Sequence, residues 1–363
     1  MSEENNFEDV QIQEHKKFPC KNCGASLTFE PGQHSLKCKY CGELNEIINE
    51  ETDIIEEDFE KMISEICMDD EMSIDVLQIK CDACGAQSTL PENVTSSNCP
   101  FCGTAIVVAN ESFKRIIKPK YLIPFNISKS KGQELYSKWI KSHFFAPNAL
   151  KKMAQLDSIT GVYTPYWTYD AQAESQYFGE RGTNYTTTQT QNGKQESVTK
   201  VRWSYVSGTV SHFFDDVLVA ASKSLPQKLA NQLTNWNYSE LVNYKEEFVS
   251  GFRTEIYQID LKEGFDGAKI KMDEEVKSLI KSNIGGDQQR ISKQNTKYSE
   301  ITFKHVLLPI WISSYRYKNK IYNFLINGQT GDICGNYPKS AWKIMGVILL
   351  VIAILAGIFW IMR

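Results

Sequence analysis

The longest apolar segment of the chain is an uninterrupted run of nineteen apolar or small residues, from Ile344 to Met362. A helix of that length spans about 28 Å, close to the roughly 30 Å thick hydrocarbon core of a bilayer. Lys339 and Lys343 precede the run, and lysines on that flank favour a cytoplasmic position for the rest of the chain. The pattern predicts a single-pass cell-membrane protein whose transmembrane helix covers residues 342–362; a helix buried in a protein core is the alternative.

Residues 110–338 combine helical and strand periodicity, which predicts an α+β domain. Apolar positions three and four apart predict a helix from Asp260 to Ile284, and Gly285-Gly286 is expected to end it. Ser128 is expected to be the N-cap of another helix.

Strand patterns dominate after Gly161. Two runs rich in threonine, valine and aromatic residues, Thr183–Gln191 and Ser197–Ser211, flank Asn192-Gly193. Asn-Gly between alternating segments is typical of a tight hairpin turn, so these runs predict a β-hairpin.

A weak internal repeat lies in the same domain. Val162-Tyr-Thr-Pro-Tyr-Trp167, within residues 160–180, resembles Val306-Leu-Leu-Pro-Ile-Trp311, within residues 304–333. Each copy leads into an alternating aromatic segment, so we expect two similar α+β halves. We interpret the Pro-x-Trp motifs as core residues, because aromatic side chains that alternate along strands usually fill a core; a ligand groove is the alternative.

The N-terminal part of the chain is polar and contains short units. Residues 1–16 show no periodicity and predict a flexible tail. Residues 49–77 form an acidic linker in which apolar positions recur three and four apart, which predicts a short amphipathic helix. These positions are Ile55, Phe59, Met62, Ile63 and Ile66. The helix either docks on its own domain or binds a partner, and it could then cover a basic ribbon.

Composition places the chain among ordinary globular proteins. Of its 363 residues, 42% are hydrophobic and 23% are charged. The net charge of -4 argues against a dedicated nucleic-acid binder, which normally carries a strongly basic surface. The five histidines are scattered, and the sequence has no P-loop, kinase, nucleophile-elbow or dinucleotide-binding motif. We therefore expect a protein that is not an enzyme.

Two matching cysteine quartets are the strongest chemical signal. In each quartet, two C-x2-C pairs, both followed by glycine, are separated by fourteen residues, and each cysteine of the second quartet follows its counterpart by sixty-one positions. The quartets are Cys20, Cys23, Cys38 and Cys41 in residues 17–48, and Cys81, Cys84, Cys99 and Cys102 in residues 78–108. This spacing predicts two N-terminal zinc ribbons, each a small β module, produced by duplication.

Four thiolates on two such knuckles form a closed tetrahedral site, which is the arrangement of structural zinc. We therefore expect two bound Zn²⁺ ions. Disulfides would need an oxidising compartment, whereas the first residues of the chain are polar and contain no apolar signal segment. Iron–sulfur clusters and rubredoxin-type iron are the remaining alternatives. The ribbons are too small for a core of their own, so metal removal should unfold them.

The order of these features resembles a bacterial family of tail-anchored membrane proteins with two zinc ribbons of the transcription-factor-IIB type. The resemblance covers nearly the whole chain. It rests on Phe18-Pro-Cys20, Leu36-Lys-Cys38, the second quartet, Leu308-Pro309-x-Trp311, the Asn327–Gly331 turn and the terminal anchor. It implies a cytoplasmic, membrane-attached protein that helps to place phage-shock-protein-A-like and flotillin-like (SPFH) membrane-stress proteins. Only the eight cysteines carry over as functional residues.

Three functions follow as hypotheses. The first is a non-enzymatic adaptor that recruits protein partners to the inner face of the membrane, as a monomer or a homo-oligomer. The second is a membrane-bound regulator that binds nucleic acid through a basic face of ribbon 1, although a solvated surface is the simpler interpretation of that face. Its lysines are Lys16, Lys17, Lys21, Lys37 and Lys39. The third is a small-ligand sensor built on the aromatic α+β halves.

Overall fold

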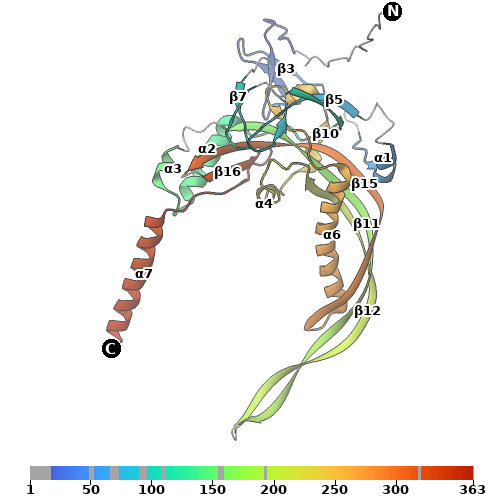
Figure 1. Ribbon diagram of the computed structural model, residues 1–363, viewed down its shortest axis with the longest axis vertical. Coiled ribbons are helices and arrows are strands. Elements are labelled where there is room, and N and C mark those ends of the chain that lie inside the picture. The colour runs from blue at the N-terminus through green and yellow to red at the C-terminus, as the bar shows by residue number, and fades with distance from the viewer. Residues whose placement is uncertain are drawn as a thin grey trace, which may run out of the picture.

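A curved β arm, a central body and two cysteine-rich ribbons make up the protein (Figure 1). The computed structural model describes residues 18–48, 53–65, 73–89, 96–107, 111–153, 159–191, 194–317 and 320–362. The predicted tail, residues 1–16, and the predicted Asn192-Gly193 turn lie outside the described residues. The arm and the C-terminal helix α7 extend to the same side of the body.

The central sheet contains two units with the same order of elements. The first unit is β10 (Tyr121–Leu122), α2 (Lys129–Ser142), β11 (Thr160–Gln191) and β12 (Lys194–Ala220). The second unit is β14 (Arg253–Thr254), α6 (Leu261–Ile284), β15 (Gln288–Tyr317) and β16 (Lys320–Asn327). β11 and β15 pair antiparallel, and the short first strand of each unit pairs in parallel with the long strand of the other unit. The sheet-rich body is thus an α+β domain with a repeated topology.

The repeated Pro-x-Trp segments lie side by side in this sheet. Thr164 pairs with Leu308, and these residues occupy equivalent places in the two motifs, so a local two-fold relation passes through this pair. Trp167 is fully buried and Trp311 is 4% exposed. The interpretation of both tryptophans as core residues is confirmed.

Shorter elements complete the body, and capping follows the sequence signals. They are α3 (Asn148–Met153), α4 (Gln227–Ala230), the 3-10 helix η1 (Tyr238–Glu240), β13 (Val242–Asn243), α5 (Glu246–Val249) and β17 (Ile333–Gly335). Ser128 caps α2 by accepting a hydrogen bond from a backbone N–H, and Asp260 caps α6 in the same way. Gly285 ends α6 with a φ of 67°, a conformation that favours glycine. The predictions for Ser128 and for Gly285-Gly286 are confirmed, and the helix predicted from Asp260 begins one residue later, with Asp260 as its N-cap.

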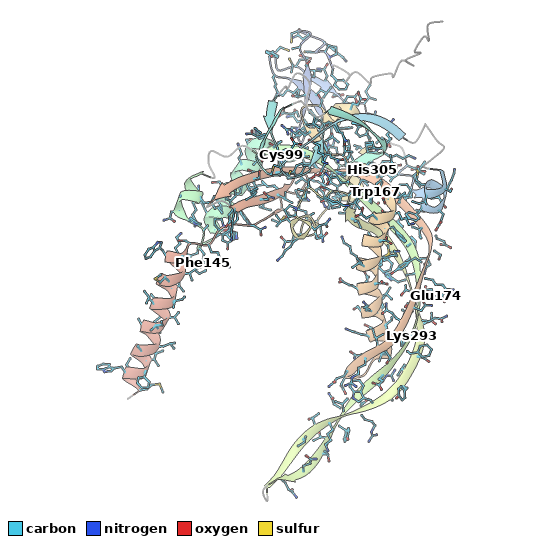
Figure 2. The ribbon with its side chains drawn as sticks, in the orientation of Figure 1. Cys99, Phe145, Trp167, Glu174, Lys293 and His305 are labelled. Atoms are coloured by element: carbon cyan, nitrogen blue, oxygen red, sulfur yellow. The ribbon has the colours of Figure 1, made fainter. Side chains whose placement is uncertain are left out.

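The arm is formed by β11, β12 and β15, with α6 packed on one face. Along β11, Ala173 and Tyr177 face α6 and are buried, whereas Glu174 points outward (Figure 2), as expected from the two-residue period of a strand. The predicted hairpin is present but longer than its sequence signal. β11 and β12 continue beyond the pair of Gly182 with Gln288, where β15 begins, so the end of the arm is a two-stranded tip.

The two ribbons are built from short antiparallel strands. Ribbon 1 contains β1 (Leu27–Glu30), β2 (Ser35–Cys38) and β3 (Leu44–Glu46). Ribbon 2 contains β5 (Ser73–Lys80), β6 (Gln87–Ser88), β7 (Ser96–Asn98), β8 (Ala105–Val107) and β9 (Glu111–Ile117). β5 pairs with both β6 and β9, so strand pairing in ribbon 2 continues beyond residues 78–108 on both sides.

The acidic linker belongs to the body. β4 (Glu57–Asp58) pairs with β15, and α1 (Phe59–Glu65) follows it directly. Phe59 is buried, and its ring centroid lies 4.9 Å from that of a phenylalanine in α6. Of the apolar positions of the predicted helix, Ile55 precedes α1 and Ile66 lies outside the described residues. The sequence left open whether this helix docks on its own domain or binds a partner, and the structure shows that it docks on its own domain.

The last described helix, α7 (Ala341–Ile361), is long and apolar enough to cross a membrane. Its mean hydropathy is 3.0, and none of its most apolar stretch is buried against the rest of the protein. The predicted transmembrane helix at residues 342–362 is thus confirmed in its length and apolar character. The cytoplasmic position of the body stays a prediction.

Candidate metal centres

All four cysteine knuckles have the same backbone geometry. In the first, the N–H of Cys20 donates to the carbonyl of Ala25, and the N–H of Gly24 donates to the carbonyl of Cys20, both at 2.8 Å. The glycines of the four knuckles have φ values between 73° and 78°. A residue with a Cβ rarely adopts this conformation, which explains the glycine after each C-x2-C pair.

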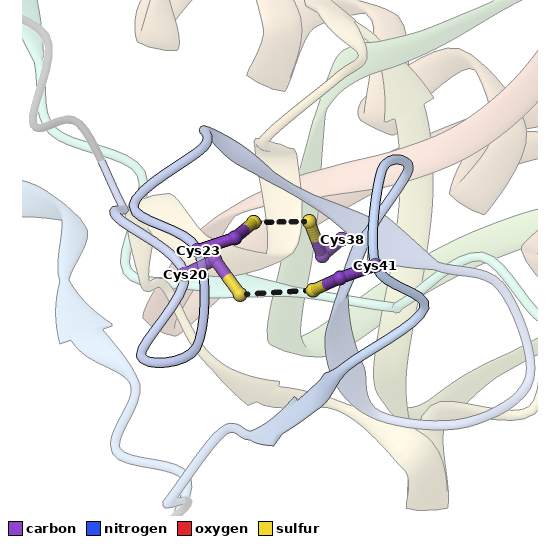
Figure 3. Close-up of side chains that lie close together, drawn as sticks. All are labelled: Cys20, Cys23, Cys38 and Cys41. Carbon is purple, nitrogen blue, oxygen red and sulfur yellow. Dashed lines mark hydrogen bonds between the residues drawn. The ribbon is translucent and has the colours of Figure 1, made fainter.

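Each quartet brings its four sulfur atoms together. In ribbon 1, the Sγ atoms of Cys20 and Cys41 are 3.5 Å apart, and those of Cys23 and Cys38 are also 3.5 Å apart (Figure 3). The corresponding distances in ribbon 2 are 3.7 Å for Cys81–Cys102 and 3.6 Å for Cys84–Cys99.

These distances fit a tetrahedral metal site. All ligand atoms of a quartet lie within 4.8 Å of one another, and a zinc ion with Zn–S bonds of about 2.3 Å separates its sulfurs by about 3.8 Å. A disulfide would need sulfurs about 2.05 Å apart, and all eight cysteines are free. Both quartets are therefore suited to a metal ion and consistent with structural zinc, with no ligand position left over.

Backbone N–H groups favour the deprotonated form of one thiol in ribbon 1, which is the form that binds a metal. The backbone N–H groups of Cys41 and Tyr40 lower the pKa of the Cys38 thiol to about 6, so Cys38 is a thiolate at neutral pH. The N–H of Ala25 acts in the same direction on Cys23, but the neighbouring Cys38 and Cys41 raise the pKa of Cys23 to about 12. A divalent cation would offset this repulsion between thiolates, because a metal ligand must be deprotonated.

Each quartet is half buried in the body. Cys20 and Cys38 are 3% and 1% exposed and belong to the core around Phe29, whose ring lies 5.5 Å from that of Phe248 in α5. Cys81 and Cys99 are each 2% exposed and belong to a second core cluster. A metal bound in either quartet would therefore join a ribbon to the body. Sequence reasoning found the ligands but not this docking, because Phe29 carries no local signal of its distant partner.

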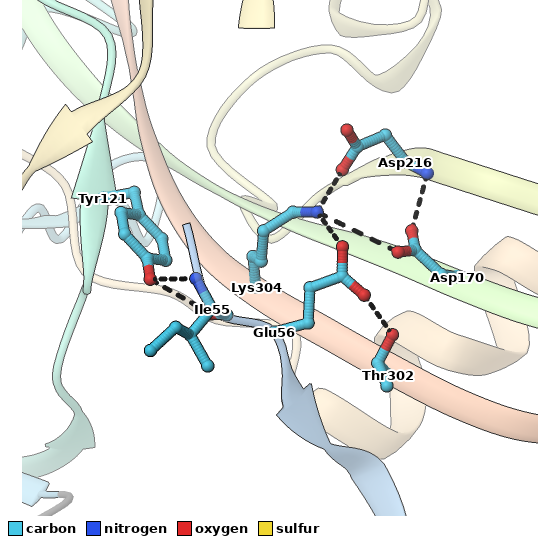
Figure 4. Close-up of polar contacts among 7 residues, drawn as sticks. All are labelled: Ile55, Glu56, Tyr121, Asp170, Asp216, Thr302 and Lys304. Atoms are coloured by element: carbon cyan, nitrogen blue, oxygen red, sulfur yellow. Dashed lines mark hydrogen bonds and ion pairs between the residues drawn. The ribbon is translucent and has the colours of Figure 1, made fainter. Parts of the chain in front are cut away.

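A third group of ionisable side chains surrounds Lys304 in β15 (Figure 4). The Nζ atom of Lys304 lies 2.6 Å from Oε1 of Glu56, 2.7 Å from Oδ1 of Asp216 and 4.0 Å from Oδ2 of Asp170. Thr302 donates its hydroxyl hydrogen to Glu56, and the backbone N–H of Asp216 donates to Asp170, both at 2.6 Å.

This Lys304 cluster is a set of buried charges with an internal counter-ion. Lys304 is 5% exposed and Asp170 is 4% exposed. Burial, together with the neighbouring Glu56, raises the pKa of Asp170 to about 7. For Glu56, hydrogen bonds from Asp170 and Lys304 outweigh burial and lower the pKa to about 2, so the two carboxyl groups share a proton near neutral pH. We interpret the cluster as structural, because the lysine ammonium occupies the place of a cation.

The strands are irregular at this point. The register shifts next to Asp170 on both sides of β11, and Asp216 and Glu300 both have a φ of 52°. Such bulges bend a sheet, and the arm curves away from the body here. Sequence reasoning missed the cluster because its members come from four separate segments.

A cavity of about 80 Å³ lies beside the cluster, lined by Ile55, Tyr121, Phe303 and His305 among others. It is small compared with the roughly 300–1,000 Å³ of typical ligand sites. The ligand-sensor hypothesis gains no support from its size.

Comparison with known proteins gives one relative. The chain is 28% identical over 336 residues to the uncharacterized protein YdjG of Bacillus subtilis (strain 168), and the match covers 90% of this chain and 91% of that protein. The two are similar over almost their whole length. No family model matches the chain, and no solved structure matches it.

Proposed function

We propose that this chain is a non-enzymatic adaptor, attached to the cytoplasmic face of the cell membrane by α7 and stabilised by two structural Zn²⁺ ions. Its role is to bind protein partners and hold them near the bilayer. The family resemblance supports phage-shock-protein-A-like or flotillin-like partners in a membrane-stress response. Tethering favours even weak contacts, because it raises the local concentration of both partners.

The open edge of the arm is the observation that carries this proposal. Within the described sheet, β12 is a terminal strand that pairs with β11 along one edge only. The free edge of a strand presents unpaired N–H and C=O groups, which can bind an extended segment of another chain. Tyr205 is 90% exposed and Phe213 is 53% exposed on the same strand, so apolar contacts are also available there.

Shortening the arm tests the adaptor function. Replacing residues 185–200 by Asn-Gly closes the hairpin after the pair of Asn184 with Val201 and removes only the two-stranded tip. Because β15 does not reach this tip, we expect an unchanged unfolding midpoint and two retained ions. Capture from solubilised membranes, followed by mass spectrometry, should recover fewer partners than the full chain does.

A point substitution on the arm complements the shortened chain in this capture experiment. Tyr205→Ser within the intact arm should reduce recovery of the same partners. Equal recovery by the full and shortened chains would place the partner site outside the tip, and equal recovery by the Tyr205→Ser chain as well would contradict a partner site on the edge of β12. Recovery of no membrane-stress protein by either chain would contradict the adaptor proposal itself.

One observation favours the nucleic-acid alternative. Tyr40 is 84% exposed on the second knuckle of ribbon 1, beside exposed Lys39, and an exposed aromatic next to a lysine can stack on an unpaired base. If this face binds nucleic acid, neutralising Lys21, Lys37 and Lys39 should abolish binding. Binding of a single strand by the native chain should weaken by about 0.7 log units per phosphate contact for each tenfold rise in salt. A filter-binding titration checks both, and salt-insensitive binding would contradict this alternative.

A further inference from the structure

The α2–α3 loop, residues 143–147, is fixed to the first turn of α7. The backbone N–H of Ser340 donates to the carbonyl of Phe145 at 2.8 Å, and Figure 2 shows Phe145 beside the start of α7. The ammonium group of Lys343 donates to the carbonyls of Ala146 at 2.8 Å and Phe144 at 3.1 Å. The same group donates to the side chain of Asn148 at 2.8 Å. The loop therefore stays at the level where α7 begins.

The loop presents an apolar side chain at that level. Phe144 is 62% exposed, and Trp342, in the first turn of α7, is 81% exposed. The ammonium of Lys343 lies 5.7 Å from the centroid of the Phe144 ring. Aromatic rings next to lysines are typical of the zone between lipid headgroups and acyl chains, because the ring is apolar and the ammonium stays in water.

Further lysines surround this position. Lys141 lies in the last turn of α2 and Lys339 precedes α7, and both are exposed. The Nζ atom of Lys151, in α3, donates to the carbonyl of Lys141 at 3.0 Å, so α3 adds a third positive charge next to the loop. Positive charges close to a bilayer are attracted to anionic phospholipid headgroups.

We propose that the α2–α3 loop is a second membrane contact, in which Phe144 enters the interfacial zone of a bilayer and the surrounding lysines bind anionic headgroups. This inference rests on the proposed membrane attachment through α7. A bilayer is the occupant that fits, because the loop is hydrogen-bonded to the helix that would enter it. Two contacts on one surface would fix how the body is oriented on the membrane, which a single helix would leave free to rotate.

Photo-crosslinking of the full chain tests this contact. The photoreactive residue p-benzoylphenylalanine replaces Phe144 in one variant and Tyr40 in a control variant. Tyr40 is similarly exposed, at 84%, but lies in ribbon 1, on the far side of the body from α7. Both variants are reconstituted into vesicles of phosphatidylcholine with 30 mol% phosphatidylglycerol (the test composition) and irradiated. Mass spectrometry then detects lipid adducts, and flotation reports insertion of α7.

We expect both variants to float and only the variant at position 144 to form lipid adducts. Their yield should fall several-fold in pure phosphatidylcholine vesicles, because the lysines then lose their anionic partners. Flotation without adducts at position 144 would overturn the second contact and leave the anchor intact. Failure of both variants to float would instead overturn membrane attachment. Adducts to a second copy of the chain, in place of lipid, would overturn the bilayer as occupant.

Discussion

Removal of metal from the cysteine quartets is expected to unfold both ribbons and to destabilise the body. Structural zinc sites supply on the order of 10–16 kcal/mol of folding free energy in small modules. Here Cys20 and Cys38 also pack into one core cluster, and Cys81 and Cys99 pack into another. The loss should therefore reach Phe29 and its contact with α5. The measurement is elemental analysis combined with a denaturant titration, before and after a strong chelator.

Cysteine variants separate the two sites. Cys38→Ser should lower the bound metal from two ions to one and expose ribbon 1 to proteolysis, while ribbon 2 stays protected. Cys334→Ser is the matched control, because Cys334 is buried outside both quartets and its Sγ contacts only the carbonyl of Leu229 in the described hydrogen bonds. A native protein that contains no metal, or one whose unfolding midpoint is unaffected by the chelator, would contradict this account.

Lys304→Met is expected to destabilise the native state by about 3–5 kcal/mol, the typical effect of removing one partner from a buried ion pair. The substitution keeps most of the side-chain volume but leaves Glu56, Asp170 and Asp216 without their counter-ion. Urea unfolding, followed by tryptophan fluorescence, measures the change. Lys293→Met is the control, because Lys293 is exposed on the arm (Figure 2) and should shift stability by less than about 0.5 kcal/mol.

A second substitution tests the charge explanation. Asp170→Asn in the Lys304→Met background removes one of the unpaired acids, so it should restore part of the lost stability. The rescue should grow as the pH rises above 7. Burial and the neighbouring Glu56 raise the pKa of Asp170 to about 7 in the native cluster, and loss of the Lys304 charge, which lowers this pKa, raises it further, so that Asp170 is uncharged at neutral pH and ionises only at higher pH. A Lys304→Met protein as stable as Lys293→Met would show that the cluster contributes nothing.

Local signals in the sequence predicted the parts of the structure that depend on local physics. The anchor follows from an apolar run, the quartets from cysteine spacing, and the ends of α6 from Asp260 and Gly285. Each of these features is set by residues within a few positions of one another. The predicted hairpin is present, with Gln191 and Lys194 as its last described pair, but its strands are much longer than Thr183–Gln191 and Ser197–Ser211, because α6 packs on them and β15 pairs with them.

The features that sequence reasoning missed depend on contacts between distant segments. Glu56, Asp170, Asp216 and Lys304 each look like an ordinary charged surface residue, and only the bend in the sheet brings them together. The docking of ribbon 1 depends on Phe29 meeting a helix more than two hundred positions later. Neither arrangement produces a periodic pattern within one segment of the sequence, so neither could be predicted from local signals.

The arrangement of the arm and α7 limits how the protein can sit on a bilayer. From Asp170 to Gln191 the arm is about 70 Å long at roughly 3.3 Å per residue, more than twice the length of a membrane-spanning helix, and its threonine- and glutamine-rich tip cannot reside in hydrocarbon. An inserted chain would therefore need a wider angle between the arm and α7 than this structure has. An arm that lies along the lipid surface would extend about that distance from the anchor of the same chain.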